Sequence, residues 1–577
     1  MSRNEIEDEE ARLGSWPRRL LHVPTMTSYG WAPGNMYGRF KEPAYNAITY
    51  TWGRWRLKDQ EHPHVPALTI SGVPWQIPRV KPSAFTAAQL HNVIQQATKV
   101  YSQAENPHID YRNYKQFQPT EFIWLDIACI DQRSHVRRSA AEIGRQAQIF
   151  HGARQVFVWL GTINSTTLKQ LILELEKLHR LMVNLRTSDK PRHTTSVVDQ
   201  FKRFHICFRT ILNDPWFSSL WTLQEAYLRP DAVLFGHDAI PVVNEDIGET
   251  HHILWDILGY CEEFFARRIE NIGEPFPAIQ RLLENSGLEA LSSLNGLAAY
   301  IAANHRTTLR DEDRVYGIQQ IFRLRVGKSS PLSRPGTSYT RQELELQLGE
   351  QLLKYHPVLS QLHVSTEPVP IGSGWFVGKS STVPSELLGN VSNKEPGSKN
   401  TETPLCTLSV VAVKGKHWGH FSGTLSKFSK LQAEFEELED RASLRGLSSS
   451  STLMMVHLNK TPELSSSPEY RIHGQQPVPQ GDWQRHICRW LGRSFEKRED
   501  LFVLLLGLRK NDFYNTMLGL ILLKSRTRDG FSYYRRVGLC WWDPVDELGV
   551  YRKWDIMAKL SRLHEESFWT RGNGYFG

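Results

Sequence analysis

The chain has 577 residues, of which 40% are hydrophobic, 23% charged and 11% aromatic, and its formal net charge is +8. A chain of this length exceeds one ordinary domain of about 100 to 200 residues, and its apolar content excludes a wholly disordered protein. Because the charge is spread along the chain and no nucleic-acid-binding motif is present, we expect no specific nucleic-acid partner.

The six cysteines lie far apart without a CxxC pair, which excludes the disulfide framework of a small secreted domain. The chain begins MSRNEIEDEEAR, which is acidic and polar, whereas a signal peptide needs a basic start and an apolar centre. The longest apolar runs, 501–506 and 520–523, are much shorter than the roughly 20 residues that span a bilayer. We therefore expect a cytoplasmic protein without a membrane span.

Short apolar and aromatic runs predict two strands near the start of the chain, over 19–23 and 45–52, and Gly53 ends the second. A Ser-Gly pair then separates two further apolar runs and predicts a hairpin over 67–77. A helix follows over 83–97, where apolar residues recur near the helical period.

Residues 122–130 (FIWLDIACI) are apolar apart from Asp126, which is the pattern of a strand buried on both faces of a parallel sheet. A helix over 141–150 and an apolar strand over 155–160 follow, so this stretch predicts a β-α-β unit. An isolated buried carboxylate is costly, and Asp126 must therefore be paired, hydrogen-bonded or at the mouth of a cleft.

The rest of the chain divides by composition. The first domain ends with helical stretches over 168–185, 197–212 and 216–228 and a short strand over 232–235. We predict four parts: an α/β domain with a parallel sheet over 15–240, a helical extension over 241–360, an irregular loop-rich segment with one helix over 361–480, and a β-rich domain over 481–577. Apolar runs separated by Gly and Asp turns predict that the last part forms its own antiparallel sheet.

Three blocks in this order and spacing resemble the fungal heterokaryon-incompatibility (HET) domain. They are YNAITYTWG at 45–53, FIWLDIACIDQ at 122–132 and PWFSSLWTLQEAYL at 215–228. The resemblance implies a protein of fungal self/non-self recognition, whose HET domain triggers growth arrest or programmed cell death when incompatible cells fuse.

The resemblance extends past the domain and also has two departures. The segment RDEDRVYGI at 310–318 is similar to one that follows the domain in long family members, with Asp313 and Tyr316 matching. Glu312 stands where that segment usually has an arginine, and Ser219 stands where the third block usually has one. The Ser219 departure puts any role of that positive charge in doubt.

The HET domain is regarded as a distant relative of the Toll/interleukin-receptor (TIR) fold, which implies a TIR-like parallel sheet. SSLWTLQE at 218–225 resembles the TIR segment Ser-x-x-Trp-Cys-x-x-Glu, with Thr222 in place of the cysteine. Since that glutamate is catalytic in TIR enzymes that cleave nicotinamide adenine dinucleotide (NAD), the resemblance makes Glu225 the candidate catalytic residue. The residues that it makes candidates for ligand binding are Trp52, Gly53, Asp126 and Trp221.

The chemistry of NAD cleavage suits such a set of residues. Departure of nicotinamide builds positive charge on the ribose, which a nearby carboxylate stabilises, and aromatic walls that exclude water strengthen the interaction. A glycine lets the backbone approach a phosphate closely. Each of these residues can also have a purely structural role. The tryptophans can belong to the core, Asp126 can be a hydrogen-bonding group at the end of a strand, and Glu225 can be a helix residue that bridges to a basic neighbour.

Two mechanisms remain open on the sequence. One is an NAD-cleaving nucleosidase, with NAD as a substrate rather than a cofactor, and the other is a non-enzymatic module that signals through self-association or contacts with other incompatibility proteins. The sequence lacks a zinc-binding spacing such as HExxH, a P-loop, a GxGxxG loop and a GxSxG elbow. It therefore favours no metal site and no other family of nucleotide-binding or hydrolytic sites.

Overall fold

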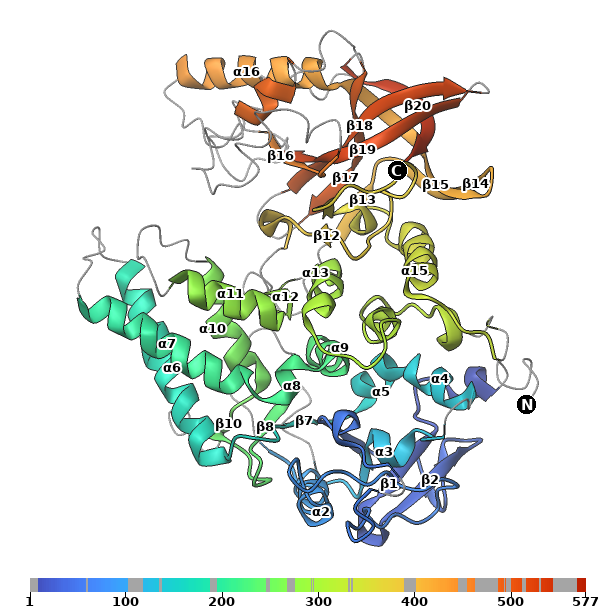
Figure 1. The fold of residues 1–577 in the computed structure, drawn as a ribbon, viewed down its shortest axis with the longest axis vertical. Helices are drawn as coiled ribbons and strands as arrows, with labels where there is room; N and C mark the ends of the chain where they lie inside the picture. Colours follow the sequence, from blue (N-terminus) through green and yellow to red (C-terminus); the bar gives the residue numbers. More distant parts are fainter. Residues whose placement is uncertain are drawn as a thin grey trace. The chain divides into compact units, whose positions relative to one another are not determined.

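A computed structural model gives the structure of the chain. It describes residues 9–58, 61–101, 118–133, 137–186, 195–244, 250–266, 276–291, 293, 295–330, 333, 336–388, 401–444, 454–461, 486–491, 493, 500–510, 515–528, 531–542 and 568–577. The chain forms two compact units (Figure 1). The first comprises Met1–Leu344 and Asn390–Pro396, and the second comprises Glu345–Gly389 and Gly397–Gly577.

The first unit is built on an eight-stranded sheet with the order β4-β3-β2-β1-β6-β5-β7-β8. Its strands are β1 (Arg19–His22), β2 (Thr27–Ala32), β3 (Met36–Tyr37), β4 (Phe40–Lys41), β5 (Tyr45–Thr49), β6 (Phe122–Trp124), β7 (Val156–Trp159) and β8 (Val233–Phe235). The last four are parallel to one another, whereas β1 to β4 form an antiparallel extension that joins the sheet through β1 and β6. The sheet is therefore mixed, and the prediction of a parallel sheet is correct only for its second half.

The order of the parallel strands indicates where a ligand-binding site can form. Across the sheet the parallel strands lie in the order β6-β5-β7-β8. The chain therefore passes from β5 to β6 on one side and then to β7 on the other side of β5. This order reverses direction between β5 and β7, and open α/β sheets bind ligands outside the carboxyl ends of the strands at such a point. All five residues of β5 are buried, as expected for a central strand covered on both faces.

Helices surround this sheet and extend the first unit. They are α2 (Ala87–Gln96), α3 (Asp126–Cys129), α4 (Arg137–Ile143), α5 (Gln146–Gly152), α6 (Ser165–Arg186), α7 (Thr195–Leu212), α8 (Pro215–Ser218), α9 (Leu220–Leu228), α10 (Leu254–Ala266), α11 (Phe276–Ser286), α12 (Leu288–Leu291), α13 (Gly296–Ala302) and α14 (Asp313–Tyr316). The long helices α6 and α7 lie side by side, and α10 and α11 pack against them (Figure 1). A small two-stranded sheet, β9 (Val243–Asn244) and β10 (Thr250–His251), precedes α10.

The predicted hairpin over 67–77 is wrong. Ser71 forms an isolated parallel bridge with Thr27, and Gly72 takes a φ of 77°, but no strand forms on either side. Pro66, Pro74 and Pro78 each lack a backbone N–H, so the two apolar runs cannot form a regular ladder. The following helix begins later than predicted. Thr86 caps it, accepting a hydrogen bond from the Gln89 backbone in a capping box.

Three predicted elements are broken in the structure. The helix predicted over 141–150 divides at Gly144 and Arg145 into α4 and α5. The strand predicted over 122–130 ends at Trp124, and the chain turns into the short helix α3 at Asp126. The helical stretch predicted over 216–228 divides at Ser219, whose extended backbone separates α8 from α9. Hydrophobic periodicity could not reveal the last two breaks, because the residues on both sides of each are equally apolar.

The second unit is built on a β-sheet that curves into a closed ring. Strands β15 (Lys416–Lys427), β17 (Leu501–Lys510), β18 (Asn515–Arg528), β19 (Phe531–Trp542) and β20 (Thr570–Phe576) pair in this order, and β20 returns to β15. The further strands are β13 (Thr401–Pro404), β14 (Thr407–Val413) and β16 (Met455–Leu458) at its edges and the pair β11 (Val364–Ser365) and β12 (Ser381–Thr382). All contacts within the ring are antiparallel except that of β19 with β20. The C-terminal region is thus β-rich, but its sheet also includes β13 to β16 and one parallel pair, so it is not the antiparallel sheet of 481–577 alone that the sequence predicted.

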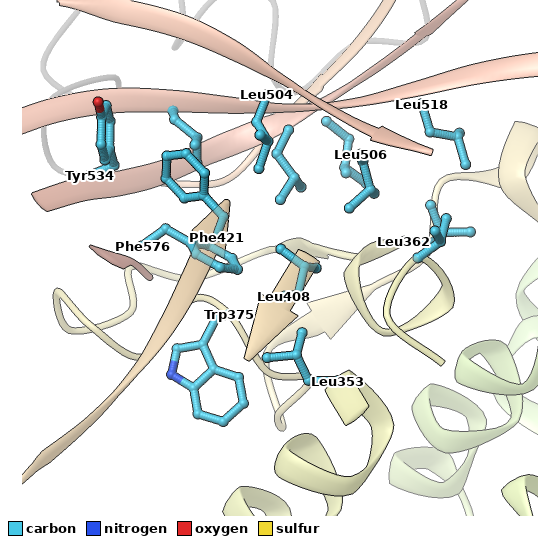
Figure 2. Packing of buried hydrophobic residues seen from close by; sticks show 14 of the residues in the cluster. Leu353, Leu362, Trp375, Leu408, Phe421, Leu504, Leu506, Leu518, Tyr534 and Phe576 are labelled. Carbon is cyan, nitrogen blue, oxygen red and sulfur yellow. The ribbon is translucent and has the colours of Figure 1, made fainter. Parts of the chain in front are cut away.

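The interior of this ring is the main core of the second unit. Figure 2 shows Leu504, Leu506 and Leu518 facing Phe421, Leu408 and Trp375, and all six are buried. Helix α16 (Phe428–Leu444) packs on the outside of the ring, where Phe428 and Leu431 contribute to a second apolar cluster. Helix α15 (Arg341–Tyr355) crosses the boundary between the units in the sequence, and its Leu353 packs in the main core of the second unit.

Residues 401–427 correct the expectation of an irregular segment with one helix over 361–480. They form β13, β14 and β15, and β14 and β15 make a hairpin closed by Lys414 and Gly415. Both of these residues have positive φ angles, 52° and 75°, as a tight two-residue hairpin turn requires. The Ser-, Gly- and Pro-rich flanks concealed an alternating strand pattern.

Arg536 connects the ring to the segment that precedes it. Its fully buried guanidinium donates hydrogen bonds to the backbone oxygens of Gln361 (2.7 Å), Gly374 (2.8 Å) and His363. Burial lowers the pKa of Arg536 to about 9. The segment from 361 to 374 is therefore held on β19 mainly through one side chain.

We expect Arg536→Met to lower the free energy of unfolding of the second unit by about 3 kcal/mol or more, because three buried carbonyl oxygens lose a charged donor. Hydrogen exchange of peptides from 361–374 measures the loss of stability in the segment that Arg536 holds. As a matched control, Arg489→Met removes a surface ion pair with Glu436, whose two side chains are 52% and 46% exposed, and should change stability by no more than about 0.5 kcal/mol. Equal effects of the two substitutions would contradict the role of Arg536.

Candidate functional site

The carboxyl ends of the parallel strands bring several polar and aromatic residues to one edge of the sheet. Strand β5 ends at Thr49 and is followed by Tyr50 and Trp52, β6 is followed by Asp126, and β7 ends at Trp159. Since β5, β6 and β7 are adjacent and parallel, these residues meet at the point where the strand order reverses.

The third block reaches the same edge from the turn between α8 and α9. Asp214 caps α8: its carboxylate accepts hydrogen bonds from the backbone N–H of Trp216 (2.9 Å) and from Thr162, which follows β7. Helix α9 then begins at Leu220. Trp221 and Glu225 are four residues apart on this helix and therefore share one of its faces.

Glu225 is attached to the central strand through Thr49. The Thr49 hydroxyl donates a short hydrogen bond to Glu225 Oε2 and accepts one from Trp216 Nε1 at 2.9 Å. Thr49 and Trp216 are both buried. One hydroxyl group thus joins β5, α8 and α9.

Asp126 is fixed beside the first block. Its carboxylate accepts hydrogen bonds from Trp52 Nε1 and from the backbone N–H of Ile127, both at 2.6 Å. Burial raises the pKa of Asp126, and these hydrogen bonds oppose the rise. Asp126 therefore stands at the end of β6 as a hydrogen-bonding group, and it also holds the indole of Trp52 in place.

Glu225 lies close enough to Asp126 for the Asp126 charge to shift its pKa. Burial raises the pKa of Glu225 from 4.5 to about 8, the Thr49 hydrogen bond opposes the rise, and the negative charge of Asp126 adds to it. Both carboxyl groups are surrounded by protein, yet both side chains are only half-buried and remain accessible to solvent. Two carboxyl groups with raised pKa values, in contact with water at a sheet edge, are typical of catalytic sites.

Two buried polar groups beside this pair have no hydrogen-bond partner among the described residues. Tyr50 stacks on Trp159, with ring centroids 6.1 Å apart, and both side chains are buried. The Tyr50 hydroxyl lies near enough to Asp126 to lower the pKa of that carboxyl but makes no hydrogen bond of good geometry, and Trp159 Nε1 also lacks a partner. Buried polar groups are usually satisfied, so these two are exceptions at this edge of the sheet.

The other two sequence-predicted ligand residues are less closely involved. Gly53 is exposed at the start of a short 3-10 helix (Gly53–Trp55), and an added Cβ would meet no atom within 4 Å. Trp221 is half-buried and makes no hydrogen bond or ring contact with either carboxyl group in the described part of the chain. The structure thus brings Glu225, Asp126 and Trp52 together and leaves Gly53 and Trp221 at the periphery.

Sequence reasoning missed a segment that holds the α8–α9 turn. Thr307 donates its backbone N–H to Ser218 O (2.7 Å), and its own carbonyl oxygen accepts from Leu220 N (3.1 Å). Its hydroxyl also accepts a hydrogen bond from Arg54 at 2.9 Å. Residues of the first and third blocks are therefore tied to each other through a residue about 80 positions further along the chain.

Arg306 stands next to the missing family arginine. Its fully buried guanidinium donates to the backbone oxygens of Trp216 and Ser219, both at 3.3 Å, and burial lowers its pKa to about 9. Its Nε and Nη2 atoms have no partner among the described residues. A positive charge is thus present at the turn even though Ser219 itself is neutral. The only sequence signal for it was its closeness to the family segment at 310–318.

The matching residues of that later segment have structural contacts. Asp313, the first residue of α14, accepts a hydrogen bond from the Thr308 hydroxyl at 3.1 Å, and the Tyr316 hydroxyl accepts one from the Lys328 backbone at 3.0 Å. Glu312 precedes α14 without capping it through its side chain. These contacts order the chain that follows Thr307.

Comparison with known proteins places this site in a family. Residues 45–225 match the family described as Heterokaryon incompatibility protein (HET). The chain carries a HET domain. The match begins at the first residue of β5 and ends at Glu225, so the HET domain contains every sequence-predicted site residue. Neither a curated protein nor a solved structure matches the chain.

The resemblance to the HET family is thereby confirmed, and it points to a function of the heterokaryon incompatibility type. No cluster of three or more His, Cys, Asp or Glu among the described residues could hold a metal ion. No helix in the described part of the chain is both long and apolar enough to cross a membrane.

The raised pKa of Glu225 predicts a pH dependence of stability. Between pH 4.5 and about 8 the unfolded chain releases a proton that folded Glu225 retains, so the free energy of unfolding falls as pH rises through this range. Glu225→Gln removes this titration. The melting temperature of the variant minus that of the wild type should therefore increase from pH 4.5 to about 8.

The control for this experiment is Glu284→Gln, because Glu284 is exposed on α11 in the first unit and accepts a hydrogen bond from the neutral Gln280 side chain. Its melting-temperature difference should not change with pH over the same range. If the Glu225→Gln difference is equally constant, Glu225 ionises normally in the folded protein.

Proposed function

We propose that the HET domain is the effector of a fungal self/non-self recognition system and that it acts by cleaving NAD at Glu225, as TIR-like enzymes do. One observation carries the proposal: two solvent-accessible carboxyl groups, whose pKa values burial raises, stand at the point where the parallel strand order reverses. Growth arrest or cell death then follows from loss of NAD.

The reaction breaks the bond between the nicotinamide nitrogen and C1′ of the ribose. The bonding electron pair leaves with nicotinamide, which becomes neutral, and C1′ develops the positive charge of an oxocarbenium ion. A carboxylate at Glu225 stabilises this charge and accepts a proton from the water that adds to C1′. The products are nicotinamide, ADP-ribose and one proton.

The protonation state of Glu225 sets a condition on this mechanism. With a pKa of about 8, Glu225 is mostly protonated at neutral pH in the free protein, whereas the mechanism requires the carboxylate. The nicotinamide ring of NAD carries a positive charge, so its binding beside Glu225 lowers the pKa and favours ionisation. The Thr49 hydroxyl acts in the same direction because it donates to the carboxylate.

The surrounding residues supply binding rather than chemistry. Asp126 holds the Trp52 indole, which can form an aromatic wall for the ligand, and a wall that excludes water strengthens the interaction of the carboxylate with developing charge. The unpaired Tyr50 hydroxyl and Trp159 N–H can donate to ligand oxygens. Trp221 and Gly53 lie at the rim of this arrangement and have smaller roles in the proposal.

A second candidate is a non-enzymatic effector that signals through self-association or through contacts with other incompatibility proteins. Two observations favour it. Ser219 replaces the family arginine, and Glu225 is mostly neutral at neutral pH in the free protein. In this account the carboxyl pair is a structural feature of the fold.

Nicotinamide release by the purified full-length protein distinguishes the two candidates. We expect release that rises with protein concentration if assembly completes the site, and we expect Glu225→Gln to reduce it at least 100-fold, as loss of a charge-stabilising group does in other enzymes. The same control, Glu284→Gln, should retain full activity. In addition, kcat/KM of the wild type should rise with pH and level off above about 8, as Glu225 ionises in the free enzyme.

Expression in fungal cells provides the second measurement. If the protein is an NAD-cleaving effector, wild type should lower cellular NAD and arrest growth, and Glu225→Gln should do neither. Growth arrest by the variant at unchanged NAD, together with no nicotinamide release at any protein concentration, would replace the enzyme with the assembly mechanism.

A further inference from the structure

Aromatic rings form a row on the outside of the β-ring in the second unit. His420 on β15, Tyr575 on β20 and Tyr533 on β19 are direct neighbours in the strand register. The ring centroids are 5.4 Å apart between His420 and Tyr575 and 5.1 Å apart between Tyr575 and Tyr533. Phe531 extends the row, with its ring 5.3 Å from that of Tyr575.

This row lies apart from the core inside the ring. Tyr533 and Tyr575 belong to a small cluster with Trp418, whereas the interior core contains the neighbouring residues Tyr534 and Phe576, which alternation directs to the other face. The row is buried at the two tyrosines and exposed at the phenylalanine. Tyr533 is 5% exposed, Tyr575 is 9% exposed, and Phe531 is 43% exposed. Packing of this small apolar cluster does not require a phenylalanine that is exposed to solvent.

The strands that form this surface have an unusual charge. Strands β14, β15, β17, β18, β19 and β20 contain no Asp or Glu, but they contain ten Lys and Arg: two each in β15, β17 and β19, three in β18 and one in β20. Arg509 and Arg536 are buried and do not contribute to this surface. The whole chain has nearly equal numbers, 69 basic and 61 acidic residues. The absence of acidic residues is therefore a feature of these strands rather than of the composition.

Cations and hydrogen-bonding groups flank the aromatic row on the same face. Alternation along β20 places Arg571 and Asn573 on the face of Tyr575, and both are exposed. Alternation along β15 likewise places exposed Lys416 on the face of His420. Burial lowers the pKa of His420, so its ring is neutral at neutral pH and offers a flat stacking surface rather than a charge.

We propose that this face, formed by His420, Tyr575, Phe531, Arg571, Asn573 and Lys416, binds single-stranded nucleic acid without sequence specificity. Bases stack on the exposed Phe531 and half-buried His420 rings, which buried Tyr575 holds in place, and phosphates contact the cations, which is how other proteins hold single strands. An anionic membrane surface would also attract the cations, but the polar His, Tyr and Asn groups of this face suit bases better than lipid chains. The proposal is independent of the activity of the HET domain.

Fluorescence anisotropy of a labelled oligo-dT of about 20 nucleotides, titrated with the full-length protein, tests the proposal. We expect micromolar binding at low salt that weakens as salt rises. Phe531→Ala should reduce affinity about fivefold or more, since stacking of a base on an aromatic ring contributes on the order of 1 kcal/mol or more. Arg571→Gln should reduce the slope of log affinity against log salt by about 0.7. Both side chains are exposed, so neither substitution should unfold the protein.

Arg489→Gln is the matched control, because this exposed arginine pairs with Glu436 of α16 and lies away from the aromatic row. It should leave affinity unchanged. The proposal is overturned if the wild type does not bind the oligonucleotide or if Phe531→Ala and Arg571→Gln both bind as the wild type does. Phosphatidylserine vesicles and heparin complete the test. Binding of vesicles but not of the oligonucleotide, or a loss of heparin binding by Phe531→Ala as large as its loss of oligonucleotide binding, would also overturn it.

Discussion

The Thr49 hydroxyl is the contact on which the candidate site depends. It belongs to the last residue of the central strand β5, accepts the N–H of Trp216 and donates to the carboxylate of Glu225. Because β5 is fixed by strands on both sides, this one group sets the position of α8 and α9 relative to the sheet. Asp214 caps α8, and Thr307 and Arg306 hold the turn that follows it, so the position of Glu225 is determined from several directions.

This arrangement places two carboxyl groups where neither ionises at its usual pH. A fold selected for stability alone would pair Glu225 and Asp126 with cations. Here their partners are neutral donors, namely a threonine, a tryptophan and a backbone amide. Burial raises both pKa values, the Asp126 charge raises that of Glu225 further, and the resulting loss of stability at neutral pH is a property that catalytic sites share. The neighbouring Tyr50 hydroxyl and Trp159 indole N–H are likewise buried at a cost in stability, because neither makes a hydrogen bond of good geometry in the described part of the chain.

The sequence predicted short strands well and long-range contacts poorly. Apolar, β-branched runs identified β5 and β7, because a central parallel strand must be apolar on both faces. The same criterion failed at Asp126, where an apolar run continues through a strand, a turn and a helix. Strands β14 and β15 were missed because they lie between two segments rich in Ser, Gly and Pro, which are typical of loops.

The candidate site was predictable only in part, for a related reason. The family resemblance identified Glu225, Asp126 and Trp52 by their motifs, and each motif is local in the sequence. Thr49, Arg306 and Thr307 act through contacts that join residues 80 to 180 positions apart. Thr49 lies within the first block, but no local pattern indicates its contact with Glu225. Gly53 was singled out for the absence of a side chain, yet the structure leaves open space around it.

The most direct test of this account is the ionisation of Glu225 itself. Infrared difference spectra of the wild type against Glu225→Gln, recorded across a pH series, isolate the carbonyl band of the protonated Glu225 carboxyl group. The account predicts that this band persists at neutral pH and disappears with a midpoint near pH 8, and that NAD shifts the midpoint downward. A band that disappears near pH 4.5, as for an ordinary glutamate, would contradict it.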